Sequence, residues 1–164
     1  MKECKIPLEK KKYTIYYYDE KWEAFNYDQL NQRIEIAKPL IEKIFNKIDL
    51  NKSLKILDIG TGPGTISIAL IDKYKALFPF YIYGIAPSSN SISRANEIVK
   101  QLKLEKKIFF KFSSFEEIPF PKNYFDVIIS NAAYNLSITK IKAIDEIARV
   151  AKKDGKVIRV LITK

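Results

Sequence analysis

The stretch that decides the fold runs from residue 56 to residue 67 and reads Ile56-Leu57-Asp58-Ile59-Gly60-Thr61-Gly62-Pro63-Gly64-Thr65-Ile66-Ser67. An apolar run typical of a buried strand ends in three glycines at alternate positions, and a helical pattern begins directly afterwards. Glycine permits a sharp turn from strand to helix and lets a ligand lie against bare backbone, while the start of a helix offers N–H groups without intrahelical partners. The stretch therefore predicts either a ligand-binding turn or, because glycines alone are a weak signal, a tight turn without a ligand.

Short apolar runs rich in β-branched or aromatic residues recur along the chain, as in strands that are buried on both faces. We expect strands at residues 54–59, 80–85, 108–112, 125–130 and 157–163. Helical periodicity lies between them, at about residues 65–75, 88–102 and 137–151. The last helix is expected to carry one apolar face, formed by Ile138, Ile141, Ile144, Ile147, Ala148 and Ala151. This alternation predicts an α/β fold with a mostly parallel sheet and right-handed crossovers.

The first 53 residues precede this alternating pattern. Residues 1 to about 20 read as a charged and then aromatic arm, and helical periodicity follows from Tyr27 to about Ile48, where Pro39 could kink or divide the helix. We therefore divide the chain into an N-terminal arm and helix that act as a cap, residues 1–53, and an α/β core, residues 54–164. The aromatic cluster of Tyr16 to Tyr18, Trp22 and Phe25 either covers a substrate or, as we favour, packs on the helices beside the sheet.

The composition excludes several kinds of chemistry. The chain has 164 residues, 47% hydrophobic and 29% charged, which is typical of one soluble globular domain. It contains no His, so there is no imidazole base, and its single Cys, Cys4, excludes an internal disulfide and a multi-cysteine zinc site. We expect no bound metal. A charged N-terminus and the lack of an 18-residue apolar run favour a cytoplasmic protein without membrane contact.

The glycine stretch resembles motif I of the class I S-adenosylmethionine (SAM)-dependent methyltransferases. Three later segments fall in step with the same family: residues 83–88 resemble its second-strand motif, 118–131 its fourth-strand region, and 145–157 the helix and turn before strand five. The resemblance covers about residues 54–162 and implies a Rossmann-like three-layer sandwich with SAM as cofactor. Residues 130–137 look most like the small-molecule branch that includes ubiquinone-biosynthesis and arsenite methyltransferases, although one cysteine cannot supply the thiols that arsenite chemistry needs.

The resemblance also implies a site at the C-terminal ends of the strands. The glycine turn would border the methionine part of SAM, and Asp58 would orient its amino end. The cofactor-binding positions implied in this way are Asp58, Gly60, Thr61, Gly62, Gly64, Ala86, Pro87, Ser114, Phe115 and Ser130. Asn131 and Tyr134 would meet the methyl acceptor and are the catalytic candidates. They also match the first and last letters of the Asn-Pro-Pro-Tyr motif of amino-methylating enzymes, with Ala at both proline positions.

Two positions depart from the family pattern. The carboxylate that usually accepts hydrogen bonds from the ribose hydroxyls is replaced by Ala86, 22 residues beyond Gly64, and the Asp that usually accepts from the adenine amino group matches Ser114. Each lost charge-assisted hydrogen bond costs on the order of 1.5 to 3 kcal/mol, so SAM binding could weaken by about a hundredfold or more. We expect a SAM site with an intact glycine half and a weakened nucleoside half.

The function we expect is methyl transfer from SAM to a small-molecule acceptor. The alternatives are a non-catalytic methyltransferase-fold subunit that regulates or scaffolds a partner, which Ala86 and Ser114 favour, and an RNA methyltransferase. The net charge of +10 permits contact with RNA, but the lysine doublets are more typical of solvated surface.

A further expectation concerns the end of the sheet. Related domains continue after strand five, so we expect a sheet truncated there, with the run from Val157 to Ile162 on an open edge. A partner subunit or a second copy, giving a homo-oligomer, could cover that edge; otherwise the chain is a truncated gene product.

Overall fold

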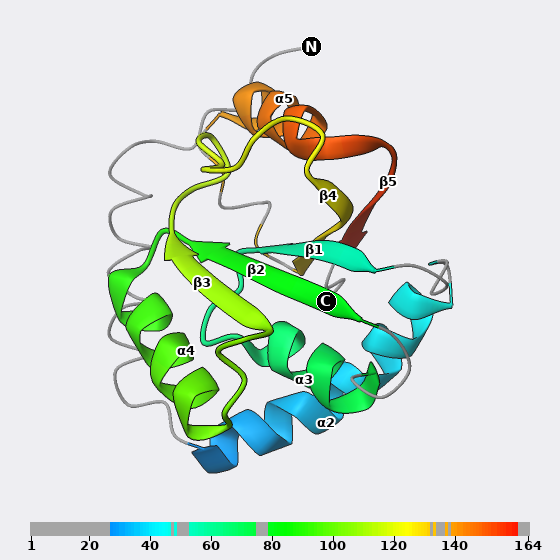
Figure 1. Ribbon diagram of the computed structural model, residues 1–164. Helices are drawn as coiled ribbons and strands as arrows, with labels where there is room; N and C mark the ends of the chain where they lie inside the picture. Colours follow the sequence, from blue (N-terminus) through cyan, green and yellow to red (C-terminus); the bar gives the residue numbers. More distant parts are fainter. Residues whose placement is uncertain are drawn as a thin grey trace.

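A computed structural model describes residues 27–46, 48, 53–74, 79–131, 133, 137 and 139–160 (Figure 1). The predictions for Cys4, the aromatic cluster of the arm and Tyr134 lie outside these residues. Along the described chain the elements are α2 (Tyr27–Phe45), β1 (Leu54–Ile59), α3 (Thr65–Tyr74), β2 (Phe80–Ala86), α4 (Ser89–Gln101), β3 (Ile108–Phe112), β4 (Phe125–Asn131), α5 (Lys140–Val150) and β5 (Ala151–Val160).

The five strands form one parallel sheet in the order β3-β2-β1-β4-β5. Helices α2, α3 and α4 cover one face and α5 lies on the other, as Figure 1 shows. The prediction of an α/β fold with a parallel sheet is therefore confirmed. No described helix is long and apolar enough to cross a membrane.

Successive residues of the central strand β1 feed two separate cores. Leu54 and Ile56 pack into the core under α2, α3 and α4, whereas Leu57 and Ile59 pack into the core on the α5 side. Because side chains alternate between the faces of a strand, a strand buried on both faces reads as a continuous apolar run. The sequence of β1 follows this pattern except at Lys55 and Asp58.

Helix α2 belongs to the first of these cores. It buries Leu30, Ala37, Ile41 and Phe45, and the Phe45 ring stacks on Tyr74 of α3 with ring centroids 4.3 Å apart. Pro39 lies inside the helix, which runs through it to Phe45, so the proline does not divide the helix.

Strand β5 starts earlier than expected, at Ala151 instead of residue 157. Phe125 pairs with Ala151, and the next pair is Val127 with Lys156, so the turn-like residues 152–155 form an irregularity within the strand. Gly155 makes this possible, because a β-carbon there would lie 3.0 Å from the Phe125 carbonyl oxygen. The described strand β5 lies at an edge of the sheet, where the Val157 side chain is exposed.

The apolar face predicted for the last helix is also in the wrong place. Helix α5 buries Ala143 and Val150, with Ile147 half-buried, whereas Ile141 and Ile144 are each 54% exposed. Ala143 and Val150 join the core that contains Phe125 and Ile128 of β4. The helix thus packs on the sheet through the face that carries Ala143 and Val150, and Ile141 and Ile144 lie on a neighbouring face that is exposed.

Candidate functional site

The turn between β1 and α3 has the backbone that its glycines predict. Gly60, Gly62 and Gly64 have φ angles of 76°, 55° and 85°. These angles lie in the left-handed region, which side chains disfavour. The N–H groups of Gly60 and Thr61 both donate to the carbonyl oxygen of Ile85, at 2.8 and 3.1 Å, which ties the turn to the end of β2.

Asp58 organises this turn from within. Its side chain is buried, and its Oδ2 accepts hydrogen bonds from the hydroxyls of Thr61 and Ser67, each at 2.8 Å. Burial raises the pKa of the carboxyl group, and the hydrogen bonds from Ser67 and Thr61 act in the opposite direction. Asp58 thus joins the end of β1 to the first turn of α3, and any contact with a ligand's amino group would add to these bonds.

Two of the turn glycines also have packing reasons to be glycine. A β-carbon on Gly60 would overlap that of Ala133, and one on Gly64 would lie 2.6 Å from Cζ of Phe110. Real β-carbon contacts are essentially never under 3.0 Å. Part of the space beside Gly60 that we expected to remain open for a ligand is therefore occupied by Ala133, and Gly64 is required by Phe110 whether or not a ligand binds.

The residues expected around the nucleoside are brought together at the ends of β2 and β3. The N–H of Ser113 donates to the carbonyl oxygen of Ala86 at 3.1 Å, and the half-buried Ser114 forms a bridge with Glu117. Ala86 is buried and offers no side-chain acceptor. Pro87 is half-buried, directly after β2.

Phe115, the remaining nucleoside candidate, points into the protein. Its side chain is buried in the core on the α5 side, among residues that include Ile85 and Ile118. The ring is thus committed to packing, so the main chain is the part of Phe115 on which the predicted contact would depend.

Ser130, near the end of β4, has a buried hydroxyl whose hydrogen bonding is not satisfied by the described residues. It is only 6% exposed, and its Oγ has no hydrogen-bond partner among the described residues. An unsatisfied buried hydroxyl costs about 1 to 3 kcal/mol, so a structure that keeps one has a reason for it, such as a ligand that completes the bond. The next residue, Asn131, ends β4 half-buried, and its predicted companion Tyr134 is not described.

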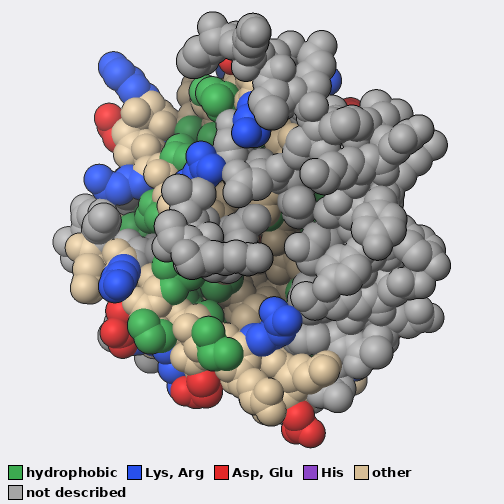
Figure 2. Space-filling model, turned by 180° about the vertical axis from the view of Figure 1, so that it is seen from behind, with side chains coloured by type: hydrophobic (Ala, Val, Ile, Leu, Met, Phe, Trp, Pro, Cys, Tyr) green, Lys and Arg blue, Asp and Glu red, His purple; other side chains and the backbone are tan. Residues whose placement is uncertain are grey.

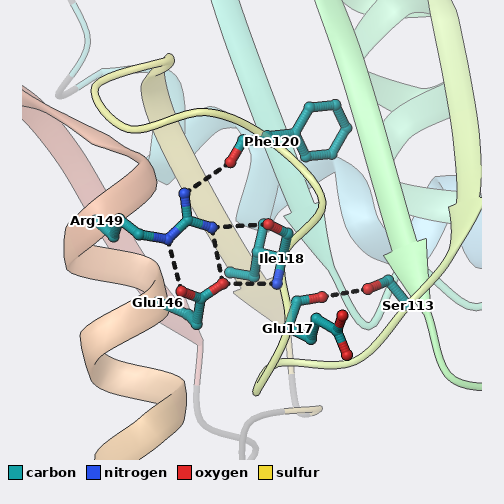
Figure 3. A network of polar contacts seen from close by, with 6 residues as sticks. All are labelled: Ser113, Glu117, Ile118, Phe120, Glu146 and Arg149. Carbon is teal, nitrogen blue, oxygen red and sulfur yellow. Dashed lines mark hydrogen bonds and ion pairs between the residues drawn. The ribbon is translucent and has the colours of Figure 1, made fainter.

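Sequence reasoning assigned no role to Glu146 or Arg149, yet both bond to the segment between β3 and β4 (Figure 3). Glu116, within that segment, was missed as well, and its carboxylate accepts from the Ser137 hydroxyl. The i, i+3 spacing of Glu146 and Arg149 on a helix was the available signal. It indicates a pair but does not reveal what else the pair contacts. Among the described residues, no group of three or more His, Cys, Asp or Glu side chains could hold a metal ion.

Positive charge is spread over the described part of the face in Figure 2. In Figure 2, which shows the side opposite to that of Figure 1, the Lys and Arg side chains are scattered among acidic and apolar ones on the described part of the face. A gathered basic patch, the electrostatic footprint of a nucleic-acid site, is not seen on that part.

Comparison with known proteins agrees with this geometry. A family model described as a methyltransferase domain matches residues 50–162. A ubiquinone/menaquinone biosynthesis C-methyltransferase of Citrifermentans bemidjiense is 28% identical over 82% of this chain and 57% of its own length, and a release factor glutamine methyltransferase of Clostridium acetobutylicum is 30% identical over 79% and 46%. The crystal structure of a SAM-dependent methyltransferase from Aquifex aeolicus matches with a TM-score of 0.61 and 26% identity, over 78% of this chain and 68% of that one.

A strand–glycine turn–helix unit on a five-stranded parallel sheet, matched along most of its length, defines the class of protein as a SAM-dependent methyltransferase fold. The chain belongs to the methyltransferase-domain family. It spans about half the length, or less, of the curated relatives that it matches first.

Proposed function

We propose that the chain transfers a methyl group from SAM to a small-molecule acceptor. The observation that carries this proposal is the turn after β1, where three alternate glycines adopt left-handed φ angles directly before the N-terminus of α3. Bare backbone beside a helix N-terminus suits a ligand with charged and polar ends. The family membership and the orphaned hydroxyl of Ser130 support the same reading.

The residues present fit SAM unevenly. Gly62, Thr61 and the start of α3 would hold its amino-acid part. The Ser130 hydroxyl, which has no partner among the described residues, would donate or accept a further hydrogen bond, and the main chain around Ser114 would meet the base. SAM supplies an electrophilic methyl group when bound. The protein then needs mainly to align the acceptor and exclude water, which requires no histidine. We assign the alignment of the acceptor to Asn131 and Tyr134.

The rival function is that of a non-catalytic methyltransferase-fold subunit that regulates or scaffolds a partner. Two observations favour it: Ala133 fills space beside Gly60, and the buried Ala86 stands where the ribose carboxylate is expected. An RNA acceptor is the second alternative. A protein acceptor is a further outcome to test, since one relative is a release factor glutamine methyltransferase.

Calorimetric titration with SAM and its demethylated product S-adenosylhomocysteine tests the proposal. A dissociation constant below about 100 µM, a free energy near −5.5 kcal/mol, supports an enzyme, whereas no heat at millimolar ligand supports the non-catalytic subunit. If binding is seen, methyl-labelled SAM incubated with metabolite, protein and RNA fractions of a cell extract identifies the acceptor class. Label that enters only protein or only RNA would overturn the small-molecule assignment.

A further inference from the structure

Glu146 and Arg149 of α5 clamp the segment that leads from β3 to β4 (Figure 3). The guanidinium of Arg149 donates to both carboxylate oxygens of Glu146, through Nε at 2.6 Å and a terminal nitrogen at 2.8 Å. It also donates to the carbonyl oxygens of Ile118 and Phe120, each at 2.8 Å. The carboxylate of Glu146 in turn accepts from the N–H of Ile118 at 2.8 Å. The pair thus satisfies three main-chain groups of one segment.

The same segment is fastened at other points. Main-chain bonds join Asn123 to Arg149 and Tyr124 to Val150, at 2.9 and 2.8 Å. Glu116 accepts from the hydroxyl of Ser137 at 2.9 Å and from the N–H of Thr139 at 3.4 Å. The segment between β3 and β4 is therefore held both by α5 and by the residues that lead into α5.

This segment carries Ser114 and Phe115, two of the proposed nucleoside positions. It begins at Ser113, whose N–H bonds to Ala86 at the end of β2 and whose hydroxyl bonds to the Glu117 carbonyl oxygen. Ile118 donates its N–H to Glu146 and accepts from Arg149 at its carbonyl oxygen, and it lies three residues beyond Phe115. Loss of the contacts from Glu146 and Arg149 would therefore shift main chain that lies only a few residues from the proposed position of the base.

The contacts of Glu146 and Arg149 should affect nucleoside binding more in this chain than in a relative with a carboxylate that bonds to the ribose hydroxyls. Ala86 supplies no acceptor and Ser114 supplies an uncharged one, so recognition of the nucleoside depends on where the main chain stands. A bidentate guanidinium–carboxylate pair is rigid, because both groups are planar and two hydrogen bonds join them. In line with this, the hydrogen bond from Arg149 lowers the pKa of Glu146, which keeps the carboxylate charged.

We propose that Glu146 and Arg149 are positioning residues for the nucleoside half of SAM, acting through the main chain of residues 113–120. The proposal rests on the proposed function, since it needs SAM to bind. It is distinct from the glycine turn, which would serve the amino-acid half. The two halves can therefore be separated by experiment.

The test compares two ligands that share the nucleoside. S-adenosylhomocysteine contains both halves, whereas 5′-methylthioadenosine contains the nucleoside without the amino-acid part. Arg149→Gln and the isosteric Glu146→Gln should weaken the binding of both ligands by the same factor, about tenfold for the loss of one main-chain hydrogen bond to the nucleoside. Gly62→Ala should weaken the first ligand much more than the second.

The matched control is Arg94→Gln. Arg94 and Glu97 form an i, i+3 pair on α4 at 2.8 Å, the same spacing and residue types as the clamp. This variant should keep both affinities within about twofold of the wild type, because exposed pairs contribute little. Titrations are carried out well below each variant's melting temperature, so that loss of fold does not enter.

Three results would overturn the inference: affinities that stay the same while only the melting temperature falls, a loss restricted to S-adenosylhomocysteine, or an equal loss in Arg94→Gln. Glu146→Gln keeps the inference testable if Arg149→Gln does not fold. If the wild type itself binds neither ligand, the proposed function fails and the positioning role falls with it. Binding by the wild type with unchanged variants rejects the positioning role alone.

Discussion

Phe110 and Gly84 stand opposite each other in the register of β3 and β2, and the Phe110 ring fills the space that a β-carbon on Gly84 would need. The same ring lies against Gly64 at the start of α3. One aromatic side chain thus explains two of the glycines in structural terms, without any ligand. Ala133 explains Gly60 in the same way, which leaves Gly62 as the turn glycine without such a packing contact among the described residues.

Gly84→Ala should therefore destabilise the protein. The new methyl group overlaps the Phe110 ring and approaches Oγ1 of Thr61 to 2.9 Å. Overpacking of this kind costs about 1 to 3 kcal/mol, or roughly 2 to 4 °C in melting temperature per kcal/mol for a chain of this size. Thermal unfolding followed by circular dichroism measures the loss.

The control for this prediction is the pair Gly84→Ala with Phe110→Leu. Because leucine is smaller than phenylalanine, the double variant should lose less than the sum of the single losses. Strict additivity would show that the ring is not the obstacle. For Gly64→Ala the same partner change should rescue less, because the φ angle of 85° strains alanine in any surroundings.

These contacts mark the limit of what the sequence could reveal. The turn after β1 was predictable because strand, glycines and helix follow one another directly in the chain. The contact of Phe110 with Gly84 was not, because it depends on the register between two strands. The early start of β5 was missed because Gly155 reads as a turn, whereas the structure places it inside a strand as an irregularity. The clamp of Glu146 on Ile118 spans 28 residues, a separation that no local pattern encodes.

Asp58 makes a prediction about pH. Its folded-state pKa is raised above the ordinary value of 3.8 by burial. A raised pKa means that the folded protein binds the proton more tightly, so this group's contribution to stability is complete below the unfolded pKa and is lost as pH rises through the folded pKa. Asp58→Asn removes that titration. The free energy of unfolding of the wild type minus that of Asp58→Asn should therefore fall as pH rises.

Urea denaturation of both proteins between pH 4 and neutrality, extrapolated linearly to zero denaturant, measures this difference. At every pH the variant should also lose about 1 kcal/mol or more, because a neutral amide oxygen accepts hydrogen bonds from the two hydroxyls more weakly than a charged carboxylate does. A difference that rises with pH would mean that hydrogen bonding from Ser67 and Thr61 outweighs burial.

Ser130→Ala should improve stability and impair binding. The hydroxyl is buried without a described partner, so its removal should stabilise the free protein by up to about 1 kcal/mol. If the hydroxyl serves SAM, the affinity for S-adenosylhomocysteine should fall by about tenfold. Chemical denaturation and calorimetry give the two values.

Ser67→Ala is the matched control for this change. Ser67 is also fully buried, but its hydroxyl donates to Asp58 at 2.8 Å, so the same substitution should destabilise the protein by about 1 to 3 kcal/mol. If Ser130→Ala loses stability as Ser67→Ala does, the Ser130 hydroxyl has a partner in the free protein. The case for a ligand at that position would then end.

Ala86→Asp should tighten SAM binding by restoring the carboxylate that the family uses for the ribose. One charge-assisted hydrogen bond contributes about 1.5 to 3 kcal/mol, so an affinity gain of tenfold or more for S-adenosylhomocysteine is expected. Because Ala86 is buried, the new carboxylate should also lower the melting temperature of the free protein, and ligand should restore it. Ala86→Asn has nearly the same size without the charge and should gain much less. An equal affinity in all three proteins would show that the nucleoside does not lie at the end of β2, since a charge placed beside its hydroxyls must be felt there.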